Sequence, residues 1–128
     1  MKEMKDTTKR GELIKLTMEC MGVAITIIDT QGTLLYYNKG AARILDRKPE
    51  YMGKDIRSDH KEAASNRKLD SMLQDFQKGR TKPFYFEVKP YGKTILVIFS
   101  RILENDKFIG CVQSVLLRED IESASLPT

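Results

Sequence analysis

The chain alternates between stretches with a helical spacing of apolar residues and short runs that are almost wholly apolar. Between Thr7 and Cys20 the apolar residues fall mostly on one side of a helical wheel, which predicts an amphipathic N-terminal helix. After Gly22 the run "VAITIID" is rich in β-branched residues and is typical of a buried strand. The stretch "DTQG" predicts a tight turn, and "TLLYYN" predicts the returning strand.

Asn38 lies directly before "KGAARIL", where an asparagine side-chain oxygen can accept from the free N–H groups of a helix start. We therefore expect Asn38 to end the second strand and to cap a short helix. The next stretch, "DRKPEYMGKDI", contains Pro49 and Gly53, which predict separate single turns. We expect the segment from Pro49 to Ser65 to be able to move.

A longer helix is predicted from Glu62 to Lys78, because apolar residues recur there at helical spacing before Gly79. Three apolar runs follow, "KPFYFEVKP", "KTILVIFSRIL" and "KFIGCVQSVLL", and the short turn-forming gaps between them predict an antiparallel meander. The pattern predicts an α+β fold with a five-stranded antiparallel sheet and helices on one face. It divides into an N-terminal helix within residues 1–22, a domain over 23–118 and a flexible tail over 119–128.

Composition narrows the class of protein without identifying it. At 128 residues, with 41% hydrophobic and 31% charged residues, the chain fits one globular domain, and no apolar run is long enough to cross a bilayer. The N-terminus has no apolar leader, so we expect a cytoplasmic protein. The net charge of +4 is scattered, without a basic block, so we expect neither a nucleic-acid nor a membrane partner. The two cysteines, Cys20 and Cys111, lack metal-site spacing, and we expect free buried thiols.

The order of these elements, and above all the stretch "IIDTQGTLLYYNKGAARIL", resembles a PAS domain, a sensory module of bacterial signalling proteins. The resemblance runs from about Leu13 to Leu117 and includes "YMGKDI" and the glycine-terminated "DFQKGR". It implies a pocket between the longer helix and the inner face of the sheet, which holds haem, flavin, a small organic ligand or nothing. It also implies a non-enzymatic sensory or interaction module that relays the state of the pocket to a signalling partner or effector domain.

The pocket candidates are apolar residues of the longer helix and the strands, together with one glutamine. They are Ile27, Leu35, Met72, Phe76, Phe84, Phe86, Val97, Phe99, Cys111 and Gln113. Strand alternation selects one set of residues on each strand but does not say which set faces inward. Ordinary core packing is the alternative explanation for most of them. Gln113 resembles the strand glutamine of flavin-binding members, but it stands three residues after Gly110 where two are expected, which favours a structural role.

His60 is the only histidine, so the alternative function is a haem-binding sensor of a diatomic gas or of redox state with His60 as the ligand. Haem-binding members of the family carry their histidine within the longer helix, near the position of Lys68 here. A covalent flavin adduct is excluded because no cysteine lies between Asn38 and Lys78. Non-covalent flavin stays open, no other metal is expected, and the cofactor is unknown from the sequence.

The N-terminal helix offers a second functional surface. Related domains often dimerise through such a helix, and Leu13, Ile14, Leu16 and Met18 would supply the contact in a homodimer. The alternative is that this side of the helix folds back on its own sheet.

Two further features bear on output and on catalysis. Many family members end the last strand in an aspartate-isoleucine-threonine motif that links the sheet to an effector. This chain has "VLLREDIE" there, with Leu117 at the position of the aspartate, so we expect it either to signal by direct protein contact or to be part of a longer protein.

A small enzyme ranks lowest, because Asp29, Asp59 and Glu87 fall at turns or solvent faces and no nucleophile–base pair is visible.

Overall fold

The computed structural model describes residues 7–59 and 63–124. A five-stranded sheet forms its centre, with the strand order β2-β1-β5-β4-β3. The strands are β1 (Ala24–Asp29), β2 (Leu34–Tyr37), β3 (Phe84–Val88), β4 (Ile95–Glu104) and β5 (Lys107–Leu117). Every neighbouring pair is antiparallel, which confirms the predicted sheet.

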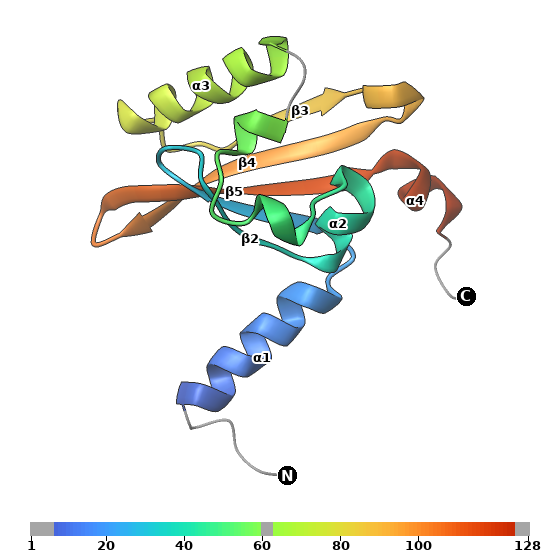
Figure 1. Ribbon diagram of the computed structural model, residues 1–128, viewed down its shortest axis with the longest axis horizontal. Helices are drawn as coiled ribbons and strands as arrows, with labels where there is room; N and C mark the ends of the chain where they lie inside the picture. Colours follow the sequence, from blue (N-terminus) through green and yellow to red (C-terminus); the bar gives the residue numbers. More distant parts are fainter. Residues whose placement is uncertain (1–6, 60–62, 125–128) are drawn as a thin grey trace.

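The described residues also form four α-helices and three short 3₁₀ helices. They are α1 (Thr7–Cys20), α2 (Lys39–Leu45), η1 (Pro49–Tyr51), η2 (Ile56–Asp59), α3 (Ala63–Gln77), η3 (Pro90–Gly92) and α4 (Arg118–Ser123). Figure 1 shows α2, η1, η2 and α3 gathered over the sheet, while α1 extends away from it. Side chains of α2 and α3 pack on the same sheet face, which we call the inner face, so the predicted α+β class is confirmed.

The direction of the β1 side chains fixes which strand residues face the helices. Ala24 packs with Ala41 of α2, and Ile28 packs with the apolar side of α3. Because successive side chains of a strand point to opposite faces, Thr26 lies on the inner face and Ile27 on the outer face.

The turn between β1 and β2 forms as the sequence predicts. The Asp29 carboxylate accepts hydrogen bonds from the backbone N–H groups of Gln31 and Thr33, both at 2.9 Å. Gly32 has a φ of +90°, a conformation that a residue without a Cβ adopts at little cost. These contacts hold the hairpin closed at one end of the sheet.

Asn38 ends β2 and caps α2, as predicted. Its Oδ1 atom accepts from the N–H of Ala41 at 3.0 Å, which satisfies one of the free donors of the helix start. The same oxygen accepts from the N–H of Ile25 at 2.9 Å. The side chain is buried, so the cap also joins α2 to β1.

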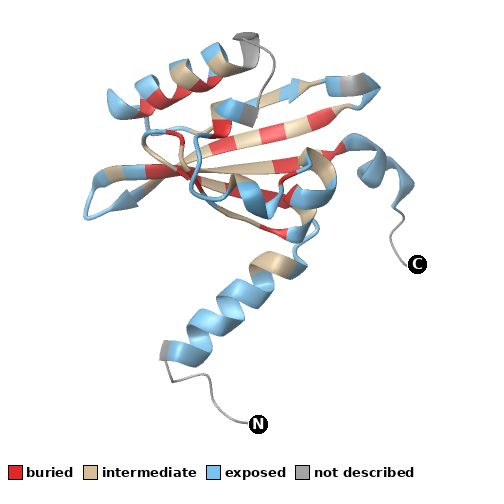
Figure 2. Cartoon of the chain, in the orientation of Figure 1, coloured by how far each residue is buried: buried red, intermediate tan, exposed pale blue. Residues whose placement is uncertain are grey.

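The helix α1 forms as predicted, but apart from its last turn it extends away from the sheet of its own chain (Figure 1). Leu13, Ile14 and Leu16 are 45%, 64% and 61% exposed, and Figure 2 shows most of the helix as exposed. The alternative in which this side folds back on its own sheet is therefore wrong. The prediction of a buried thiol is wrong for Cys20, which is exposed, while Cys111 is buried.

The C-terminal residues also differ from the prediction, because a helix replaces the first part of the expected flexible tail. Glu119 and Asp120 lie in the first turn of α4, where the helix dipole favours negative charge. Asp120 also forms an ion pair with Arg43 of α2 at 2.7 Å. Leu117, at the position of the family's aspartate, is buried in the core.

Candidate functional site

The inner face carries two apolar clusters, one beneath α3 and one beside α2. The first cluster consists of Ile28, Ile56, Leu69, Met72, Leu73, Phe76, Phe99 and Cys111. The second consists of Ala24, Ala41, Ile95, Val97, Val115 and Leu117. The region between α3 and the sheet is therefore an apolar core, as the sequence predicts.

Phe76 of α3 is the centre of the first cluster. Its ring meets that of Phe84 edge-on with centroids 5.2 Å apart, stacks on Phe99 at 6.1 Å and lies 5.8 Å from Phe108. These distances are typical of aromatic pairs in direct contact. The four rings therefore form one aromatic group beneath α3.

A polar strip separates the two clusters on the inner face. Thr26 of β1 lies directly opposite Gln113 of β5, which in turn lies opposite Phe99 of β4. Thr26 is fully buried, and its Oγ1 atom has no hydrogen-bond partner within the part of the chain that the structure describes. Gln113, one of the predicted pocket candidates, therefore lies on the inner face, and whether it contacts a ligand stays a prediction.

Arg47 reaches this strip from the end of α2. Asp46 follows the helix in the left-handed conformation, with a φ of +56°, and so reverses the chain direction. The Arg47 side chain then enters the core, where the residue is only 7% exposed. Its Nη2 atom donates to the Oε1 atom of Gln113 at 3.3 Å.

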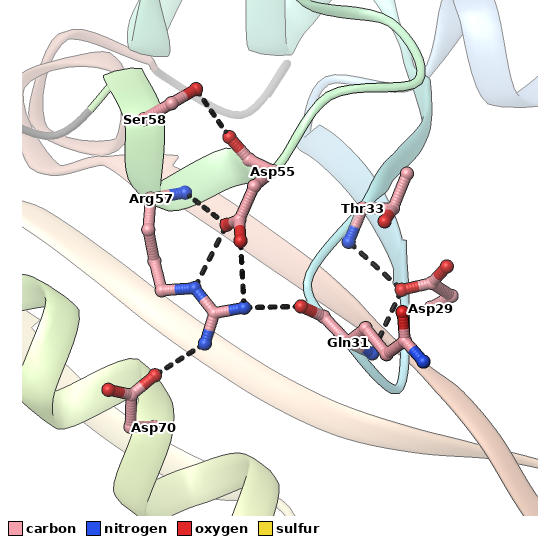
Figure 3. A network of polar contacts seen from close by, with 7 residues as sticks. All are labelled: Asp29, Gln31, Thr33, Asp55, Arg57, Ser58 and Asp70. Carbon is pink, nitrogen blue, oxygen red and sulfur yellow. Dashed lines mark hydrogen bonds and ion pairs between the residues drawn. The ribbon is translucent and has the colours of Figure 1, made fainter.

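Arg57 joins three segments above the first cluster, as Figure 3 shows. Its guanidinium forms ion pairs with Asp55 of the same loop and with Asp70 of α3, and it donates to the backbone carbonyl of Gln31 in the β1–β2 turn. The hydrogen bonds that this guanidinium donates to Asp55 and Asp70 raise the pKa of Arg57 above its ordinary value. We call this group of contacts the Arg57 clamp. A Cβ on Gly32 would lie 2.9 Å from the Arg57 guanidinium, so the glycine also makes room for the clamp.

A shallow hollow of about 300 Å³ lies at the edge of the domain, between α3 and β3. Met72, Phe84 and Phe86 line it, and the Nζ atom of Lys68 lies 4.8 Å from the centre of the Phe86 ring. A cation over an aromatic face is a stabilising contact. Lys68 is thus engaged with β3, at the position where related haem-binding domains carry a histidine.

Several predicted pocket residues do lie in the inner-face core, and two do not. Met72, Phe76, Phe99 and Cys111 belong to the first cluster, Val97 belongs to the second, and Phe84 and Phe86 pack against them. Whether any of them contacts a ligand stays a prediction.

The assignments of Ile27 and Leu35 to the pocket are wrong. Ile27 pairs with Tyr36 on the outer face, opposite to the inward-facing Thr26 and Ile28. Leu35 is 50% exposed, because a β-bulge makes it the extra residue between the Ile27–Tyr36 and Ile28–Leu34 pairs.

The remaining question about cofactors concerns His60 and groups of side chains that could hold a metal ion. His60 lies outside the described residues, so its role as a haem ligand stays a prediction. Residues 7–59 and 63–124 contain no group of three or more His, Cys, Asp or Glu side chains that could hold a metal ion. In the same ranges no helix is long and apolar enough to cross a membrane.

Sequence reasoning missed the residues that give the site its polar character. Thr26 stands in a β-branched run, where the pattern indicates only a strand, while Arg47 and Arg57 stand among other charged residues in a loop. The one available signal was Asp46, since an aspartate just after a helix can adopt the left-handed conformation that turns the next side chain back.

Comparison with known proteins identifies the family. The family model described as PAS domain matches residues 14–116, which is most of the chain. Comparison with curated protein sequences gives no significant match.

Solved structures share the fold at low sequence identity. The PAS domain of a protein from Colwellia psychrerythraea has a TM-score of 0.68 at 16% identity, covering 84% of this chain and 96% of that one. The PAS domain of BvgS from Bordetella pertussis has a TM-score of 0.68 at 13% identity, covering 88% and 91%. The photoactive yellow protein domain of the sensor histidine kinase Ppr from Rhodospirillum centenum has a TM-score of 0.62 at 16% identity, covering 79% and 90%. With most of its length matched by the family model, the chain belongs to the PAS domain family of sensory signalling modules.

Proposed function

We propose that this PAS domain is a non-enzymatic sensory and interaction module in signal transduction. It binds a small organic ligand between the inner face of the sheet and α3, and it relays the state of that site through protein–protein contacts. The observation that carries the proposal is the Arg57 clamp, since one side chain links α3, the β1–β2 turn and the loop between α2 and α3.

The loop of residues 46–59 is suited to such a relay because it contacts both the core and the surface. Ile56 belongs to the cluster beneath α3, and its N–H donates to the carbonyl of Gly32 at 2.8 Å. The neighbouring Gly53 and Lys54 exchange backbone hydrogen bonds with Leu34 of β2, both at 2.9 Å. A ligand that displaces core side chains beneath this loop would shift the population of its clamped form.

Native mass spectrometry of freshly purified protein tests the binding part of the proposal. The chain has a mass of 14.7 kDa, and we expect a second species heavier by the mass of one small molecule. Unfolding in urea and refolding should remove that species. The proposal fails if fresh protein carries no added mass and no member of a broad metabolite mixture restores one.

The relay surface that we propose is a homodimer formed by α1 and the outer face of the sheet. Leu13 and Leu16 lie one helical turn apart and are exposed on the part of the helix that extends away from its own sheet. An isolated helix of 14 residues is marginal in water, so a partner would stabilise it. On the outer face, an apolar hollow of about 420 Å³ lies between Tyr85, Ile98 and Leu116.

The anchor of α1 supports a fixed direction for this helix. The Tyr36 hydroxyl donates to the Glu19 carboxylate at 2.7 Å. Burial and this hydrogen bond raise the pKa of Tyr36 to about 12. The last turn of α1 is therefore held at the sheet, and the exposed residues, with half-buried Met18, are presented in one orientation.

Sedimentation equilibrium tests the homodimer. We expect wild-type protein to show a monomer–dimer equilibrium that Leu13→Gln together with Leu16→Gln, or Ile98→Gln alone, shifts toward monomer. Lys15→Gln is the control, because Lys15 lies on the opposite side of the helix from Leu13. A wild-type chain that stays monomeric at millimolar concentration would refute this part.

A further inference from the structure

The polar strip of the inner face has a chemical character that an ordinary apolar core lacks. Thr26 is fully buried and its hydroxyl has no partner among the residues that the structure describes. Its neighbour across the sheet, Gln113, already accepts a hydrogen bond from Arg47. Burying a hydroxyl without a hydrogen bond is unfavourable, so this position is suited to a group that supplies one.

Arg47 adds the second half of a binding site. Its guanidinium is a planar fork of five N–H donors that matches the geometry of a carboxylate. It lies in the core beside Gln113, where Arg47 is only 7% exposed. A threonine hydroxyl can also donate, and Thr26 lies directly opposite Gln113, the residue that Arg47 contacts.

The surroundings of the strip are apolar on both sides. Phe99 lies opposite Gln113 on β4, and Ile28 follows Thr26 on the same face of β1. A ligand here would need one acceptor group for the strip and an apolar body for its neighbours. Small size is also required, because the rings around Phe76 occupy much of the space beneath α3.

We infer that the ligand is a small carboxylic acid with an apolar body, whose carboxylate is bound by the Thr26 hydroxyl and the Arg47 guanidinium. This inference rests on the proposed sensory function and names the class of its ligand. Arg47 stands at the start of the loop that the Arg57 clamp closes, so binding of the acid acts directly on that loop.

NMR titration with sodium benzoate tests the inference, with benzyl alcohol as the neutral probe of similar size. Benzoate should cause saturable shifts of the Thr26 and Gln113 amides and of the Arg47 side-chain N–H. Thr26→Val keeps the shape and removes the hydroxyl, so it should weaken benzoate binding by about tenfold, as expected for a hydrogen bond to a charged group. It should leave the melting temperature of ligand-free protein unchanged or higher, because the valine carries no group without a partner.

Gln113→Glu provides a second variant that keeps the size of the side chain. Its carboxylate would pair with Arg47 in place of the ligand and should abolish the benzoate shifts. Shifts from benzoate confined to surface residues, no saturable shift at all, or unchanged benzoate affinity in Thr26→Val would each overturn the inference. Inner-face shifts with benzyl alcohol but not with benzoate would overturn the acid and leave the sensory function in place.

Discussion

The Nδ2 atom of Asn38 donates to the backbone carbonyl of Met18 at 2.7 Å and thereby joins the last turn of α1 to the junction of β2 and α2. The same nitrogen donates to the carbonyl of Val23 at 2.9 Å. Since Oδ1 accepts from the N–H groups of Ile25 and Ala41, one buried side chain holds four segments together. A change in the core near α2 therefore has a direct route to the exposed helix α1.

Asn38→Asp should destabilise the domain by about 3 kcal/mol, since it removes two buried donors and places a carboxylate against two carbonyl oxygens. The cap of α2 would remain, because the acceptor oxygen is kept. Urea unfolding followed by circular dichroism measures the effect. The neighbouring Lys39 is exposed, so Lys39→Ala is the control. Equal stability of the two variants would contradict the role of Asn38.

Arg57→Met should open the Arg57 clamp with a small loss of stability. The side chain is partly exposed, so the free energy of unfolding should fall by only about 1 kcal/mol. The amides of Gly53 and Ile56, which bond to the β1–β2 hairpin, should exchange faster with solvent. Hydrogen exchange by mass spectrometry reads this out, and Arg67→Met, at an exposed position of α3, is the control. Protection that stays unchanged in Arg57→Met would show that the clamp does not hold the loop.

Gly110→Ala should destabilise the sheet by about 3 kcal/mol or prevent folding. A Cβ at this position would lie 2.4 Å from the carbonyl oxygen of Ile28, so β1 and β5 would have to separate. Gly22→Ala is the matched control, because no atom lies within 4 Å of its Cβ position. Thermal unfolding compares the two variants. Similar melting temperatures would mean that β1 and β5 do not approach as closely as described.

The domain should lose stability in alkaline solution because of Cys111. Burial raises the pKa of this thiol from 9.0 to about 12, so the unfolded chain releases its proton at a lower pH than the folded chain does. The stability is fully present below pH 9 and falls as pH rises toward 12, by about 1 kcal/mol at pH 10.

Urea unfolding at pH 8 and pH 10 measures this loss. Cys111→Ala should reduce the difference between the two pH values, whereas Cys20→Ala, which changes an exposed thiol, should leave it in place. An equal pH dependence in wild type and Cys111→Ala would assign the alkaline loss to other groups.

The parts of the fold that depend on neighbours in the sequence could be predicted. The turn at Asp29 and the cap at Asn38 each use a side chain that bonds to a backbone group two to four residues away. The Arg57 clamp could not be predicted, because its partners Asp70 and Gln31 lie 13 and 26 residues away. Only the packed fold brings these three residues together.

The direction of the strand residues was harder to predict for a physical reason. Ile25 and Ile28 lie on opposite faces of β1, and both are buried, so the run "VAITIID" has no alternation of apolar and polar positions to mark its inner face. The error at Leu35 has another origin, since the bulge in β2 changes the alternation by one residue.

Hydrogen exchange of the loop in occupied and emptied protein tests the central claim most directly. Freshly purified protein carrying its small molecule should protect the Gly53 and Ile56 amides to a different degree than protein emptied by unfolding in urea and refolding. The difference should disappear when the small molecule is added back. Identical exchange rates at these two amides in occupied and emptied protein would contradict a relay through the loop.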